Sequence, residues 1–98
     1  MVEVRETEEY RAWFAKLRDP NARARILTRI RRLELGNPGD VQPIGEGVSE
    51  LRIDWGPGYR VYYAQRGPVI VVLLCGGDKR TQDADIRRAK QLAGELEG

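Results

Sequence analysis

Histidine is missing from the 98 residues of this chain. Its absence excludes Ser/His and Cys/His nucleophilic pairs and histidine metal sites, so acid–base work falls to Glu, Lys, Tyr or the substrate's own groups. Cysteine occurs once, at Cys75, and so has no intrachain partner for a disulfide. A lone cysteine inside an apolar stretch indicates a reducing compartment and a core thiol rather than a nucleophile.

Long apolar runs are missing too. No stretch approaches the ~18 residues of a membrane-spanning helix, and the charged N-terminus lacks the core of a signal peptide. We therefore expect a cytoplasmic protein. A chain of this length predicts one domain, residues 1–98, that buries roughly 60 to 65% of its unfolded surface, too little for a deep cleft between two domains.

Lysine is scarce relative to arginine. The formal net charge is only +2, but it results from 14 arginines and 3 lysines against 15 acidic residues. Arginine stays charged at any biological pH, and its planar fork matches phosphate oxygens with two hydrogen bonds. This composition favours nucleic acid or an acidic protein as the partner over a neutral metabolite.

The N-terminal third predicts a short strand at residues 2–5 followed by two helices. Thr7 is placed to cap the first helix, and Asp19 followed by Pro20 is a strong start signal for the second. Each helix carries an apolar stripe at spacings of three and four, which indicates a face packed on the core. The stripes consist of Tyr10, Trp13, Phe14 and Leu17, and of Ala22, Ile26, Ile30 and Leu33 broadened by Leu27.

Arginines cover the rest of the second helix. We single out Arg25, Arg29 and Arg32 as candidate RNA contacts. A charged outer face is the usual fate of such residues, and cations near a helix C-terminus are favoured by the helix dipole. Their density also suits RNA or an acidic partner, and both interpretations stay open.

Residues 48–54 and 58–63 alternate between apolar and polar positions, as half-buried strands do, and the glycines and proline of residues 55–58 predict a turn between them. The hairpin places Leu51, Ile53, Val61 and Tyr63 under the helices. Arg60 shares the opposite face with Tyr62. We expect Arg60 to be exposed there, so that its truncation costs little stability.

The apolar run 69–75 predicts a central strand that ends at Gly76 and Gly77. Lys79 and Arg80 then emerge beside Arg52 and Arg60 to form one basic patch. Residues 36–47 are expected to be an ordered loop, without the lysine and helix of a phosphate loop. A final helix begins at Thr81 or Asp83 and runs through Leu96. The predicted fold is a small α+β domain of order β-α-α-β-β-β-α.

Three segments carry a resemblance to a known family. They are RIRRL (29–33) with GNPGD (36–40), GEGVSELRI (45–53) with GYRVYY (58–63), and LLCGGDK (73–79) continuing through Gln82 to Asp85 and Ile86. The chain resembles the RelE/ParE superfamily of bacterial toxins, most closely its HigB-like "addiction module killer" branch. The resemblance implies the RelE-like fold, a mostly antiparallel sheet with two N-terminal helices on one face and a C-terminal helix.

The resemblance also implies a type II toxin that cleaves mRNA on the ribosome, with the ribose 2′-hydroxyl as nucleophile and no metal or dissociable cofactor. Arg60 matches the strand arginine that stabilises the phosphate, and Arg52 and Lys79 take the neighbouring basic positions. Glu50 is either a base or the partner that orients Arg52, and Tyr62 contacts the substrate or donates a proton. Arg80 and Gln82 are expected at the RNA, Gln82 in a region where many relatives have tyrosine or histidine.

Two alternatives remain open. One is a ParE-like poison that binds DNA gyrase and needs no nuclease residues. The other is a non-catalytic binding module whose arginines serve only its partner. All three readings imply a cognate antitoxin, a small helix-turn-helix protein that binds DNA, and the first also implies the ribosome and mRNA as partners.

Overall fold

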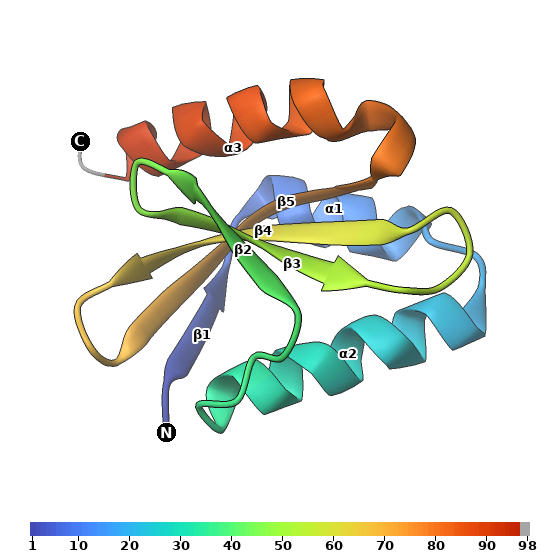
Figure 1. Ribbon diagram of the computed structural model, residues 1–98, viewed down its shortest axis with the longest axis horizontal. Helices are drawn as coiled ribbons and strands as arrows, with labels where there is room; N and C mark the ends of the chain where they lie inside the picture. Colours follow the sequence, from blue (N-terminus) through green and yellow to red (C-terminus); the bar gives the residue numbers. More distant parts are fainter. Residues whose placement is uncertain (97–98) are drawn as a thin grey trace.

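The computed structural model describes residues 1–96, which form one mixed sheet with helices on both faces (Figure 1). The five strands lie in the order β1-β5-β4-β3-β2. β1 runs parallel to β5, and the other neighbours are antiparallel. The elements are β1 (Glu3–Glu6), α1 (Glu8–Lys16), α2 (Pro20–Glu34), β2 (Val41–Gly45), β3 (Val48–Ile53), β4 (Tyr59–Arg66), β5 (Ile70–Asp78), the 3₁₀ turn η1 (Lys79–Thr81) and α3 (Gln82–Glu95).

The two N-terminal helices begin where their caps predict. The Thr7 hydroxyl accepts a hydrogen bond from the Tyr10 amide at 3.0 Å, and the Asp19 carboxylate accepts one from the Asn21 amide at 2.9 Å. Both caps satisfy amides that a helix start otherwise leaves unpaired. The two predicted stripes pack on the sheet, but Leu27 is 54% exposed, so its inclusion in the second stripe was wrong.

The alternation of β3 and β4 separates two cores, one on each sheet face. Leu51 and Val61 join the core under α1 and α2, as predicted, while Tyr62 packs on the opposite face with Ala89 and Leu92 of α3. In the pairing of β4 with β5 the register shifts between Tyr62 and Tyr63. Such a bulge changes which face successive residues take, and both layers bury part of the apolar run of β5.

Strand β2 was missed in the sequence, where residues 36–47 were expected to form a loop. The observed order is therefore β-α-α-β-β-β-β-α. Pro43 argued against a strand because it cannot donate to a neighbour, yet β2 is an edge strand with only β3 beside it. Gly45, Glu46 and Gly47 all have positive φ, at 95°, 58° and 74°, and turn the chain back into β3.

Strand β5 continues through Gly76 and Gly77 to Asp78, beyond its predicted end. The glycines do not end the strand. They leave room for other groups, since a Cβ on Gly76 would overlap the Trp13 ring and one on Gly77 would overlap the Asp85 carboxylate. Thr81 precedes α3, as expected, but its hydroxyl bonds Asp85 at 2.5 Å and does not cap the α3 amides.

Cys75 lies in the core beneath α3. Burial raises the pKa of its thiol to about 12, so the group is a neutral part of the core, as predicted. Among the described residues, no helix combines the length and the apolar character needed to cross a membrane.

Candidate functional site

Glu50 is the centre of the polar cluster on the α3 face of the sheet. Its side chain is buried, and it accepts hydrogen bonds from the Tyr62 hydroxyl at 3.0 Å, the Gln82 amide at 2.7 Å and Arg52 Nε at 3.1 Å. Arg60 Nε lies 3.9 Å from the same carboxylate. The register explains this assembly, since Glu50 pairs with Tyr62 and Arg52 with Arg60 across β3 and β4.

The environment of Glu50 keeps it ionised. Burial acts to raise its pKa, but the hydrogen bonds from Gln82, Arg52 and Tyr62 and the charge of Arg60 outweigh burial, so the pKa is lowered. Burial raises the pKa of Tyr62, and the bond to the Glu50 carboxylate raises it further. Both groups are therefore held in one protonation state, and neither is tuned to exchange protons near neutral pH.

Arg60 is buried, with 8% of its surface exposed, so the prediction of an exposed arginine was wrong. Strand alternation predicted the correct face for Arg60, but it did not predict that the side chain is buried beside the Glu50 carboxylate. Its Nη1 donates to the carbonyls of Gly58 at 3.3 Å and Tyr59 at 3.2 Å. Its Nε has no hydrogen-bond partner among the described residues. The buried Glu50 charge compensates this cation.

A hollow of about 220 Å³ lies beside Arg60. It is lined by Asp40, Arg52, Asp54, Gly58, Arg60 and Lys79. The Lys79 amide donates to the Gly58 carbonyl at 3.1 Å, and a Cβ on Gly58 would lie 2.9 Å from Lys79 Cε. Gly58, with φ at 82°, thus lets the lysine stem cross the β3–β4 turn. The hollow brings together Arg52, Arg60 and Lys79, three of the four cations predicted to form one basic patch, whereas Arg80 does not line it. Their catalytic roles stay predictions.

A second hollow, of about 420 Å³, adjoins the first at Lys79 and includes Arg80, Gln82 and Arg87. Arg80 is exposed and pairs with Asp78 at 3.0 Å. Gln82 donates inward to Glu50. Arg87, on α3, was not singled out in the sequence. The sequence does not indicate that this helical arginine lines the same hollow as Lys79.

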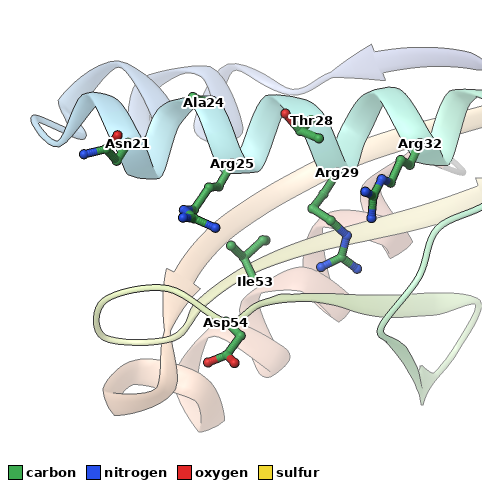
Figure 2. Close-up of a pocket in the computed structure, with 8 residues that line it drawn as sticks. All are labelled: Asn21, Ala24, Arg25, Thr28, Arg29, Arg32, Ile53 and Asp54. Atoms are coloured by element: carbon green, nitrogen blue, oxygen red, sulfur yellow. The ribbon is translucent and has the colours of Figure 1, made fainter.

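The predicted helix arginines line a third hollow, of about 450 Å³, between α2 and the end of β3 (Figure 2). Arg25 lies over the Trp55 ring, 4.0 Å from the ring centre, and the Trp55 indole donates to Asp19 at 3.1 Å. Arg32 is exposed. Asp54 lines this hollow as well as the one beside Arg60, so the two adjoin at Asp54.

Arg29 has a structural role. Its guanidinium donates to the carbonyl oxygens of Pro38 at 2.8 Å, of Asp40 at 3.0 Å, and of Arg52. Burial lowers its pKa, with the nearby Asp40 charge opposing that effect. These bonds join α2 to β3 and to the segment before β2, and they occupy the terminal nitrogens that RNA would contact.

No group of three or more Cys, Asp and Glu side chains in residues 1–96 is placed to hold a metal ion. Sequence inspection also missed Asp40 and Asp54 as members of the hollow beside Arg60. One signal in the sequence could have identified Asp54, since Glu50, Arg52 and Asp54 alternate with apolar residues and so are expected on the same side of the chain.

Comparison with known proteins corrects the family. A family model described as "Phage derived protein Gp49-like (DUF891)" matches residues 12–94. An uncharacterised protein of Haemophilus influenzae is 50% identical over 95 residues, covering 97% of this chain and 96% of that protein. The assignment to the HigB-like branch of the RelE/ParE superfamily was therefore wrong, because the family that matches is a different one. The chain belongs to the Gp49-like family of phage-derived proteins.

Proposed function

We propose that this protein is a toxin that stops translation by cleaving mRNA, acting as a metal-independent endoribonuclease within a type II toxin–antitoxin system. The observation that carries the proposal is Arg60, a permanent cation buried in the sheet with one N–H group left without a partner. It faces a hollow that also holds Arg52 and Lys79. A cation held in place before the substrate arrives costs little reorganisation when charge develops.

The chemistry needs such a cluster. When a ribose 2′-oxygen attacks the adjacent phosphorus, negative charge builds on the phosphate oxygens, and guanidinium forks match that charge. Arg60 supplies the fixed cation. Arg52, bonded through Nε to Glu50 and 37% exposed, presents its outer N–H groups. Lys79 supplies a third charge at the rim.

Glu50 serves in this proposal as the anchor that orients Arg52 and compensates the charge of Arg60. Its lowered pKa and its three hydrogen bonds argue against the alternative role of general base. Tyr62 and Gln82 complete the anchor. Arg80, Arg25 and Arg32 remain candidate contacts for the flanking RNA, since each has an exposed surface.

The proposed partners are the translating ribosome, which presents mRNA in a reactive geometry, and a cognate antitoxin that neutralises the toxin. We expect a small helix-turn-helix protein that binds DNA. These partners place the toxin in the cytoplasm.

Induced expression in a bacterial host, without antitoxin, tests the proposal. The wild type should arrest growth, and primer extension on a reporter message should detect cuts in translated codons that vanish when the start codon is removed. Lys79→Ala and Arg60→Lys should each lower the cutting rate roughly 10²-fold, as loss of one preorganised donor does. Lys16→Ala on α1 is the matched control and should cut like the wild type.

Intact messages during full growth arrest would contradict RNA cleavage, and accompanying DNA breaks would favour a gyrase poison instead. A wild type that is expressed without arresting growth would leave only a binding module. Arg60→Lys is preferred to Arg60→Ala because the cation is buried beside Glu50, and truncation would leave that carboxylate uncompensated.

A further inference from the structure

Cleavage by a 2′-hydroxyl requires a group that accepts the hydroxyl proton. The two residues that the sequence suggested for proton transfer are both constrained. Glu50 is buried with its oxygens already accepting three hydrogen bonds, and Tyr62 is buried and donates to Glu50. The inference that follows rests on the proposed function. Two other carboxylates line the hollow and could take the proton, those of Asp40 and Asp54.

Asp54 differs from Asp40 in the interactions of its carboxylate. Asp40 acts through its backbone, where its carbonyl accepts from Arg29 at 3.0 Å and from the Arg52 amide at 3.0 Å, and its charge interacts with that of Arg29. The Asp54 carboxylate is exposed and makes no hydrogen bond or ion pair within residues 1–96. It is thus free to accept a proton from a bound substrate.

The position of Asp54 also suits this role. It follows Arg52 by two residues, directly after the end of β3, and lines the hollow together with Arg52. Figure 2 shows its carboxylate pointing away from α2, at the end of β3. It lines the same hollow as Arg60 and Lys79, the cations proposed to hold the phosphate.

We propose that Asp54 is the general base of the reaction. Its carboxylate takes the proton of the 2′-hydroxyl as the 2′-oxygen forms a bond to phosphorus, and the bond from phosphorus to the 5′-oxygen breaks. The Lys79 ammonium gives a proton to the departing 5′-oxygen. The products are a 2′,3′-cyclic phosphate and a 5′-hydroxyl, and Asp54 and Lys79 return to their starting charges by exchange with water.

Single-turnover cleavage of mRNA on programmed ribosomes tests this assignment. Asp54→Asn keeps the size of the side chain and removes the base, so the maximal cleavage rate should fall about 10² to 10⁴-fold while the half-saturating toxin concentration stays within a few fold. Glu46→Gln is the matched control, because Glu46 is an exposed carboxylate outside the hollow, and it should retain the wild-type rate within a few fold. Added acetate should partly restore cleavage by Asp54→Ala, which a merely structural role would not allow.

The outcomes separate the two hypotheses. A wild type that cuts, together with an Asp54→Asn variant that cuts equally fast, overturns the role of Asp54 and leaves the nuclease proposal intact. A tenfold or larger loss of ribosome affinity in Asp54→Asn, with an unchanged maximal rate, would assign Asp54 to binding and equally overturn it. A wild type that fails to cut overturns both.

Discussion

At the scale of single residues, the fold depends on a buried ion cluster whose charges are mutually dependent. Glu50 is 1% exposed and Arg60 8%. Bringing one of these charges out of water alone would cost several kcal/mol, whereas the pair with its hydrogen bonds recovers much of that cost. The cluster is therefore weak evidence for extra stability, but removal of one partner is expected to be expensive.

We predict that Glu50→Gln lowers the free energy of unfolding by about 3 kcal/mol, because Arg60 then lies buried without a counter-charge. Glu46→Gln is the control, since Glu46 is exposed and its pair with Lys90 spans 3.6 Å; it should cost under about 1 kcal/mol. Urea unfolding at neutral pH measures both. Equal, small effects of the two substitutions would show that Glu50 is not needed to compensate Arg60.

The pH dependence of stability gives a second measurement on Glu50. The pKa of Glu50 in the folded protein is lowered from the ordinary value of 4.5. Its contribution to the free energy of unfolding is therefore fully present above pH 4.5 and is lost as the pH falls through the lower folded pKa. The wild type should lose stability in this acidic range. Glu50→Gln should show a shallower loss, because it lacks the group that takes up the proton, and parallel profiles would contradict the shift.

Sequence patterns predicted correctly which face of the sheet a side chain lies on, but they did not predict whether it is buried. Period-two alternation correctly separated Tyr62 from Val61 and Tyr63. It could not predict that Arg60 is buried, because burial depends on segments outside the strand, such as Lys79, which lines the same hollow from later in the chain. Polarity is a local property, whereas burial depends on what the rest of the chain places above a residue.

At the scale of elements, glycine has two structural roles that the sequence does not distinguish. Gly58 has a φ of 82° and forms a turn, as predicted. Gly76 lies inside β5, where the Trp13 ring occupies the space that a side chain would take. A glycine in a turn can be predicted from a neighbouring proline, but a glycine that makes room for another side chain requires the position of Trp13, 63 residues earlier in the chain. Strand β2 was missed for a related reason, since only its edge position accommodates Pro43.

Gly76→Ala should therefore lower stability by about 1 to 3 kcal/mol, because the new methyl group must displace the Trp13 ring. Gly94→Ala is the matched control. Nothing lies within 4 Å of its Cβ position in α3, so the substitution should raise stability by about 0.5 kcal/mol through the lower entropy of the unfolded chain. Tryptophan fluorescence during urea unfolding measures both variants, and an unchanged midpoint for Gly76→Ala would argue against close packing of Trp13 on β5.

At the scale of the whole molecule, two helix layers enclose the sheet, and each is held by apolar burial and by a few long-range polar contacts (Figure 1). The apolar stripes predicted which helix faces pack. The polar contacts could not be predicted, because they join residues far apart in sequence. Arg88 of α3 contacts Glu9 of α1 at 2.6 Å, and Arg29 reaches Arg52, 23 residues away.

Arg29 links the α2 layer to the sheet, and its replacement should loosen one side of the molecule. Lysine cannot reproduce a fork that donates to three carbonyl oxygens, so Arg29→Lys should cost about 2 kcal/mol of stability, and amides of β2 should exchange hydrogen faster than those of β4. Arg32→Lys, one helical turn along the same hollow, keeps its charge without comparable bonds and should change stability by under about 0.5 kcal/mol. If both substitutions are equally harmless and β2 stays protected, the edge strand is held by its pairing with β3 alone, and Arg29 is released to act as an RNA contact.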